Sequence, residues 1–278
     1  MNRKSFLKLS VLAAPALLFN QAGFSLDESL STHSNDVQFY KPTDVLYDTL
    51  RKGFNKRILK SPAIIAHCLN TNGVKQAVLL ARQKGWAVSI KSGGHCMEGF
   101  SVNNDGMMIN LSSMNQIEWI SPDTIRVQPA CTLAQLYAEL LPKGKILPGG
   151  SCASVAIGGL VLGGGYGLLA RQFGLTCDSL LSVTMVDGNG NIITSEQDPS
   201  LLWACKGGNN GNFGVITSLT FKVHAKPATM QCYRFRSYKV TADKAEIILK
   251  KWFEVTANLP PQCFSAYVLN GKTMYILL

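Results

Sequence analysis

Two nucleophilic side chains, His95 and Cys152, each lie inside a cluster of glycines. An imidazole nitrogen and a thiolate are both able to form covalent bonds by nucleophilic attack. His33, His67 and His224 lie outside such clusters, and we interpret them as hydrogen-bonded core groups or exposed side chains. The cysteines outside the clusters are interpreted as small core hydrophobes: Cys68, Cys131, Cys177, Cys205, Cys232 and Cys263. The candidate chemistry of the chain therefore centres on His95 and Cys152.

Three glycine clusters occur, over residues 91–101, 148–167 and 206–214. Adjacent glycines permit positive φ angles and close approach of the backbone, so that successive N–H groups form a cradle for an anion. Three such loops in one chain favour a large ligand that carries a pyrophosphate group across backbone amides.

Three other chemistries find weaker support. A G-x-G-x-x-A pattern at Gly165, Gly167 and Ala170 is typical of a Rossmann domain, but it does not follow a strand in an early βαβ unit. The acidic residue expected about 20 residues further on would be Asp187, which lies in a predicted hairpin turn. No Cys-x-x-Cys or His-x-x-x-His spacing favours a metal, and no G-x-S-x-G pattern favours a Ser-His-Asp hydrolase.

The elements that position these residues mix helices and short strands without strict alternation, which predicts an α+β fold. Asn72 is the expected N-cap of a helix that Gly85 ends. One face of this helix is apolar: Val74, Ala77, Val78 and Ala81. Strands are expected at residues 86–90, 107–110, 117–120, 124–127, 179–186, 191–194, 215–223 and 232–238, and further helices at 132–141 and 242–253. The glycine density falls after residue 226, which predicts a domain boundary there.

The composition excludes a disordered or fibrous chain, because 46% of the 278 residues are hydrophobic and only 16% are charged. The 27 lysines and arginines outnumber the 17 acidic residues, for a net charge of +10. Because these basic residues are spread along the chain, we expect an anionic cofactor or substrate and no nucleic acid.

The order of the motifs resembles a known family. Ser-Gly-Gly-His comes first, then Gly-Gly-x-Cys-x-x-Val with a Gly-Gly-Gly-x-Gly run, then Trp-Ala-x-Lys-Gly-Gly and Gly-Asn-Phe-Gly. This order is similar to that of FAD proteins with a PCMH-type domain, the vanillyl-alcohol-oxidase superfamily, and more narrowly to the berberine-bridge-enzyme-like oxidoreductases. The resemblance implies a two-part FAD-binding domain over residues 58–226. A lead-in over 27–57 would precede it, and the start of an incomplete α+β substrate domain over 227–278 would follow.

The resemblance also implies roles for single residues. His95 falls where the family bonds the 8α carbon of the flavin, and Cys152 where a cysteine sulfur bonds ring carbon C6. Val215 falls at a backbone contact to the adenine end. Contacts to the pyrophosphate are expected from Ser92, Gly93, Gly94, Cys96, Gly158 and Gly159. The chain departs mildly from the family at Cys96, Ala156, Lys206, Asn209 and Asn210.

By the same resemblance we expect an FAD-dependent oxidoreductase with bicovalently attached flavin. It would take a hydride from an alcohol-, sugar- or alkaloid-like small molecule and pass the electrons to O₂. Val155 lies where relatives shape oxygen access, and valine there goes with oxidases. In the family the catalytic base comes from a later portion of the substrate domain, so the resemblance names no catalytic base here.

Both ends of the chain carry signals. Residues 1–26 read as an export signal, with Arg3, Lys4 and Lys8 before a short apolar stretch at 11–19 that is too short to span a bilayer. Residues 3–8 resemble a twin-arginine motif with lysine in place of the second arginine, and a Sec-type signal is the alternative. Either signal predicts a periplasmic or extracellular location without stable membrane insertion. Residues 265–278 predict a hairpin with an Asn-Gly turn that ends within its second strand. The alternative function is therefore a truncated, catalytically inactive remnant, poorly soluble because its strand edges are exposed.

Overall fold

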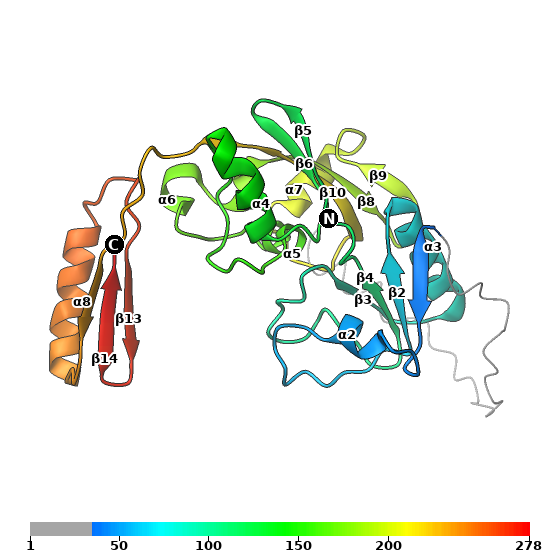
Figure 1. Cartoon of the computed structure of the whole chain (residues 1–278), viewed down its shortest axis with the longest axis horizontal. Coiled ribbons are helices and arrows are strands. Elements are labelled where there is room, and N and C mark those ends of the chain that lie inside the picture. The colour runs from blue at the N-terminus through cyan, green and yellow to red at the C-terminus, as the bar shows by residue number, and fades with distance from the viewer. Residues whose placement is uncertain (1–34) are drawn as a thin grey trace, which may run out of the picture. The chain divides into compact units, whose positions relative to one another are not determined.

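The computed structural model describes residues 35–278 (Figure 1). The predicted export signal over 1–26 lies outside the described residues, as does part of the lead-in over 27–57. No helix within residues 35–278 is long and apolar enough to cross a membrane.

The first lobe is a four-stranded sheet in the order β1-β2-β4-β3. β2 (Ile64–Cys68), β4 (Met107–Asn110) and β3 (Val88–Lys91) run parallel, and β1 (Val37–Tyr40) is antiparallel to β2. A parallel arrangement needs a crossover, which α3 (Thr71–Lys84) supplies between β2 and β3. The predicted apolar face of this helix is buried, so the prediction is confirmed.

The start of α3 differs from the sequence prediction. The N-cap is Asn70, whose side-chain oxygen accepts a hydrogen bond from the Gly73 N–H at 3.0 Å. Asn72, the predicted cap, lies inside the helix and donates to the Asp36 carboxylate. Both asparagines are suitable N-cap residues by type. The choice between them depends on Asp36, which is distant in sequence and binds both side chains, so it could not be predicted locally. The predicted end is correct, because Gly85 adopts a left-handed φ of +65°.

The second lobe is a five-stranded antiparallel sheet in the order β5-β6-β10-β8-β9. Its strands are β5 (Ile117–Ser121), β6 (Thr124–Val127), β8 (Leu180–Val186), β9 (Ile192–Thr194) and β10 (Val215–Lys222). The predicted hairpin around Asp187 is confirmed, since Val186 pairs with Ile192. A capping box between Thr132 and Gln135 begins α4 (Leu133–Leu140), whose apolar side packs into the core of this lobe.

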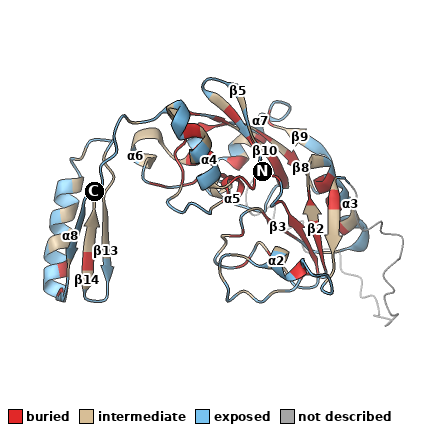
Figure 2. Cartoon of the chain, in the orientation of Figure 1, coloured by how far each residue is buried: buried red, intermediate tan, exposed pale blue. Residues whose placement is uncertain are grey.

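The two lobes share part of one core. Val186 and Val215 belong to β8 and β10 of the second sheet, yet they are buried in one cluster with residues of β2, β4 and α3. Figure 2 shows the inner strands of both lobes buried. The α+β class predicted from the sequence is confirmed.

A separate small sheet follows residue 226, with the order β12-β14-β13. It consists of β12 (Arg234–Ser237), β13 (Ala266–Asn270) and β14 (Thr273–Leu277), and its helix is α8 (Ala242–Thr256). The predicted terminal hairpin is confirmed, because Asn270 pairs with Thr273 across a turn in which Gly271 has a φ of +58°. Its core is slight, with Val240, Ala245 and Met274 buried. The domain boundary near residue 226 stays a prediction.

Several short elements were not predicted from the sequence. They are β1, α2 (Tyr47–Arg51), β7 (Lys145–Ile146), α5 (Ile157–Leu162), α6 (Ala170–Phe173), α7 (Pro199–Cys205) and β11 (His224–Ala225). α5 matters most for the site, because it lies inside the second glycine cluster. Two of its six residues are glycines, which have low helix propensity, so the segment resembled a loop.

Candidate functional site

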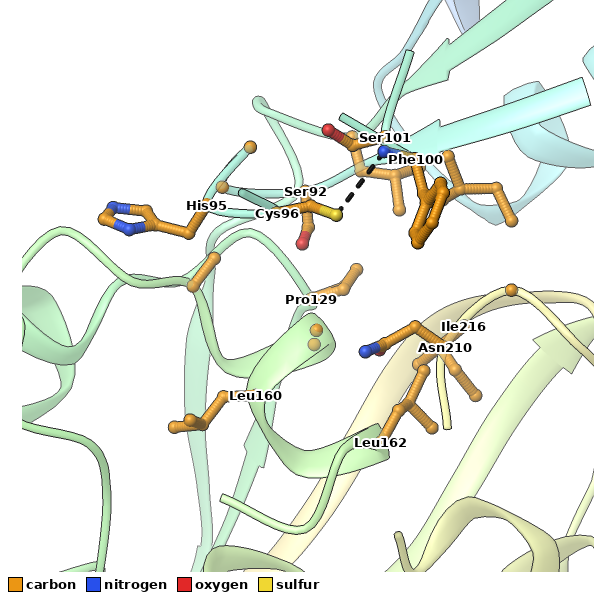
Figure 3. A pocket seen from close by; sticks show the side chains of 18 of the residues that line it. Ser92, His95, Cys96, Phe100, Ser101, Pro129, Leu160, Leu162, Asn210 and Ile216 are labelled. Atoms are coloured by element: carbon orange, nitrogen blue, oxygen red, sulfur yellow. Dashed lines mark hydrogen bonds between the residues drawn. The ribbon is translucent and has the colours of Figure 1, made fainter. Parts of the chain in front are cut away.

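The three glycine clusters meet around one cavity of about 890 Å³ (Figure 3). This volume lies in the range of about 300–1,000 Å³ that is usual for small-molecule and cofactor sites. Most of the predicted site residues line it: Ser92, Gly93, Gly94, His95, Cys96, Val155, Gly158 and Gly159. Cys152 and Val215 do not line it.

The first wall follows β3 directly. Gly94 has a φ of +72°, and a Cβ there would lie 2.8 Å from the Lys91 side chain, so that this turn requires glycine. A Cβ on Gly93 would lie 2.8 Å from the Cβ of Ala156 and 2.9 Å from its nitrogen. The first and second glycine clusters therefore touch backbone to backbone at the base of the cavity.

The second wall is α5, and its two glycines serve different purposes. A Cβ on Gly158 would lie 2.7 Å from the Pro129 side chain, so Gly158 is required by packing within the protein. A Cβ on Gly159 would meet nothing closer than the Asn210 Oδ1 and Ser92 Oγ atoms, both 3.9 Å away. Gly159 thus exposes bare backbone to the cavity, where a ligand can approach closely.

His95 lies at one end of the cavity, with its ring projecting away from Ser92 and Cys96 (Figure 3). One ring face stacks on Phe54, with 4.5 Å between the ring centroids and 19° between the planes. The Nε2 atom lies 3.0 Å from the Ser154 Oγ atom. Because Ser154 is two residues from the exposed Cys152, the loops that carry the two predicted attachment residues are in contact.

The segment of residues 50–54 is held beneath the first glycine cluster by a buried lysine. Lys91 Nζ donates to the carbonyl oxygens of Leu50 at 2.5 Å and Lys52 at 2.7 Å. The Phe54 N–H donates to the Gly94 carbonyl oxygen at 2.9 Å. Burial, and secondarily the charge of Lys56, lowers the pKa of Lys91 to about 8. The neutral amine has two N–H donors and the charged amine has three, so Lys91 can donate to both carbonyl oxygens above and below its pKa.

Val155 and Val215 play different parts. Val155 is half-buried and lines the cavity while it packs against the core of the second lobe. Val215 is only 3% exposed, and its side chain is buried in the cluster of the first lobe. Only the backbone of Val215 is therefore left for a ligand.

Sequence reasoning missed several cavity residues, among them Met97, Glu98, Phe100, Leu111, Pro129, Leu160, Leu162, Asn210 and Ile216. Glu98 and Phe100 belong to the first glycine cluster and contact Cys96: the thiol donates to Glu98 Oε2 at 3.6 Å, and the Phe100 N–H donates to the sulfur at 3.4 Å. Asn210 belongs to the third cluster, and its preceding residue, Asn209, has a φ of +80°. Asn209 therefore has a backbone conformation that is typical of glycine. Only the position of these residues within the glycine clusters could have assigned them to the cavity.

The cysteine predictions are partly corrected. Cys68, Cys131, Cys177 and Cys205 are buried as expected, but Cys232 is exposed and Cys263 is half-buried. Burial raises the pKa of each buried thiol, to about 12 for Cys131 and about 11 for Cys205. These four thiols are therefore poor nucleophiles.

Three aromatic residues near the glycine clusters are of types that often fill a core, yet they are exposed. Trp203 is 82% exposed, Tyr166 66% and Phe213 44%. Their neighbours in the sequence lack the regular apolar spacing that is typical of a buried face, which is consistent with their exposure.

The two described histidines outside the clusters differ. The His224 Nε2 atom lies 3.0 Å from the Ser179 Oγ atom, and its ring stacks on Phe173, as expected of a satisfied polar group. The His67 Nε2 atom lies 2.9 Å from the Ser113 Oγ atom, but its buried Nδ1 atom has no partner. Burial lowers the pKa of both. Within residues 35–278, no group of three or more His, Cys, Asp or Glu side chains is placed to hold a metal ion.

Comparisons with known proteins agree with this geometry. A model described as an FAD binding domain matches residues 62–196. The chain is 35% identical over 248 residues to the uncharacterized FAD-linked oxidoreductase YvdP of Bacillus subtilis (strain 168), covering 84% of this chain and 56% of that protein. It is 30% identical over 258 residues to berberine bridge enzyme-like 24 of Arabidopsis thaliana, covering 89% and 47%. The solved structure of a chitooligosaccharide oxidase superposes with a TM-score of 0.80 at 27% identity, covering 87% and 52%. The chain thus spans about half the length of the curated relatives it matches.

Proposed function

Since the chain belongs to the berberine-bridge-enzyme-like family of FAD-linked oxidoreductases, we propose that it holds the cofactor of an oxidase with bicovalently attached flavin. The substrate would be an alcohol-, sugar- or alkaloid-like small molecule, and O₂ the electron acceptor. The observation that carries the proposal is the meeting of three glycine clusters at one cavity, with the loops of His95 and Cys152 joined at its end.

The residues of the cavity fit FAD. Gly159 leaves open space where any side chain would project, and the Ser92 hydroxyl and the Asn210 amide flank that space. A pyrophosphate is recognised by such bare backbone and short polar donors. The pyrophosphate would therefore be held by the predicted contact residues, Ser92, Gly93, Gly94, Cys96, Gly158 and Gly159, with the backbone of Val215 toward the adenine end. When bound, FAD supplies a site that accepts a hydride and returns its electrons to O₂.

His95 and Cys152 would fix the isoalloxazine ring from two loops. The side chains have the required chemistry, because an imidazole nitrogen and a thiolate are both nucleophiles. Cys152 is exposed, so its thiol is accessible, and its loop meets His95 through Ser154. Two bonds from separate loops would orient the ring and tune its electronic properties.

The proposal is tested with the purified chain. We expect a flavin absorption spectrum with FAD bound to the protein, reduction of that spectrum under anaerobic conditions by a member of an alcohol, sugar or alkaloid panel, and hydrogen peroxide on admission of air. Protein that binds no flavin when supplied with FAD would contradict the proposed cofactor role. Flavin that is reduced by a substrate but is not reoxidised by air would contradict the oxidase assignment alone.

The side chain of Val155 is expected to control the reaction with oxygen. Val155→Leu adds one methylene to the packed wall of the cavity. The added group should fill the gap through which O₂ approaches and so restrict its access. We expect reoxidation to slow by about tenfold or more, which corresponds to about 1.4 kcal/mol in the barrier. Stopped-flow mixing of photoreduced protein with aerated buffer measures this rate.

Val45→Leu is the matched control, because Val45 is 95% exposed and is absent from the cavity wall. It should leave reoxidation unchanged. If Val155→Leu reoxidises as fast as the parent, Val155 does not control oxygen access.

A further inference from the structure

The His95 ring is held on two sides by residues that have no place in the predicted cofactor set. Phe54 covers one face of the ring, and the Ser154 hydroxyl meets its Nε2 atom. Phe54 comes from the lead-in, 41 residues before His95 in the chain, and Ser154 from the second glycine cluster. The imidazole is therefore fixed by contacts from two distant segments.

We propose that Phe54 and Ser154 are positioning residues that orient His95 for its bond to the flavin. This inference rests on the proposed attachment of FAD at His95. Bond formation replaces a C–H bond of the flavin 8α carbon by a C–N bond. The 8α C–H bond and the imidazole N–H bond would each release a proton, and the two electrons would pass through the flavin to dioxygen, which takes up two protons to become hydrogen peroxide.

Phe54 fixes the plane of the imidazole. A centroid distance of 4.5 Å with 19° between the planes is a stacked pair, an arrangement that stabilises beyond simple burial. Phe54 is itself 56% exposed, so burial of its own surface does not explain an aromatic residue there. Its backbone N–H is bonded to Gly94, the residue before His95, and Lys91 anchors the neighbouring residues 50 and 52. The stacking partner is therefore attached to the same glycine loop that carries His95.

The direction of the hydrogen bond with Ser154 decides which nitrogen of His95 is free, and the proposal assigns the accepting role to the hydroxyl oxygen. When its hydroxyl oxygen accepts the Nε2–H, the proton stays on Nε2 and the lone pair of Nδ1 is unshared in the ring plane. A nucleophilic imidazole needs such an unprotonated nitrogen. Together, the stacked face and the hydroxyl define both the plane of the ring and the direction of its lone pair.

The test isolates the His95 bond in a Cys152→Ala background, where His95 is the remaining attachment residue. Apoprotein is mixed with FAD, and the flavin retained in the acid pellet is followed with time. Loss of one hydrogen bond or one aromatic pair should slow attachment about fivefold in Ser154→Ala and in Phe54→Ala. Reversible affinity for FAD, measured with His95→Ala as the common background, should change by less than about twofold, because neither residue is expected to touch the pyrophosphate.

Conservative variants separate positioning from folding. Ser154→Thr keeps the hydroxyl and Phe54→Tyr keeps the ring, so both should restore most of the rate. Phe235→Ala removes a ring with similar exposure, 58%, on β12 and should leave the rate unchanged.

Two outcomes would overturn the inference. If Phe54→Ala and Ser154→Ala attach flavin as fast as the Cys152→Ala parent, the two residues do not position His95, although the attachment itself stands. If the Cys152→Ala parent binds FAD but never retains it in acid, His95 forms no bond, and the proposed linkage and this inference fail together.

Discussion

Replacing His95 and Cys152 together by alanine is expected to release all of the FAD from acid-precipitated protein, whereas each single replacement leaves the pellet yellow. Acid unfolds the chain and frees a ligand that is held only by non-covalent contacts. A flavin bound through two separate loops survives the loss of either bond, because the other one persists. Flavin absorbance in pellet and supernatant measures the effect, and mass spectrometry of the peptides that contain each residue locates the bonds.

The matched control is the pair His224→Ala and Cys232→Ala, which removes the same two residue types away from the cavity. The pellet of this double variant should stay yellow. Free FAD in the supernatant of the unmutated protein would show that neither bond exists and that the glycine clusters bind the cofactor reversibly.

Gly159→Leu is expected to weaken FAD binding by up to roughly a hundredfold while the protein stays folded. The new side chain would enter the open space between Asn210 and Ser92, which the proposal gives to the pyrophosphate. Overfilling a packed site costs up to about 3 kcal/mol, or roughly a hundredfold in affinity. Helix propensity acts in the opposite direction, because leucine is preferred to glycine within α5, so the melting temperature of the apoprotein should not fall.

Binding is measured by fluorescence titration in the His95→Ala, Cys152→Ala background, where it is reversible. Gly188→Leu serves as the control, since a Cβ at Gly188 meets nothing within 4 Å and the residue is remote from the cavity. Unchanged affinity in Gly159→Leu would show that the cofactor does not pass over α5.

Much of the fold follows from local patterns in the sequence. The apolar face of α3, the Asn270 turn and the hairpin around Asp187 are predictable because each depends on residues adjacent in the chain. The predicted N-cap of α3 lies two residues late, because the choice between Asn70 and Asn72 depends on Asp36. The helix α5 escapes prediction because Gly158 is explained by contact with Pro129, a residue distant in the chain, and not by local preference.

The part of the candidate site that lies in the glycine clusters is predictable from the sequence, and the part that depends on long-range contacts is not. Glycine clusters are visible in the amino-acid sequence, so Gly159 and Ser92 can be assigned to the site from their neighbours in the chain. Phe54 gives no such signal, because its contact with His95 joins segments about forty residues apart and apolar residues of that kind are common everywhere. Lys91 lies in the first glycine cluster, but its hydrogen bonds to residues 50 and 52 are equally long-range and are not visible in the sequence. The sequence also does not separate the two roles of glycine, close packing at Gly158 and open backbone at Gly159.

The burial of Cys68, Cys131, Cys177 and Cys205 bears on the working lifetime of the proposed oxidase. Each turnover would release hydrogen peroxide beside the protein's own thiols, and peroxide oxidises the thiolate form. The raised pKa values keep the buried thiols protonated, so they resist this self-inactivation. Cys152 would be withdrawn from the same damage by its bond to the flavin. Oxidation over many turnovers would then fall on the accessible thiols, namely Cys96 in the cavity wall and the exposed Cys232, where a sulfenic acid disturbs no packed core.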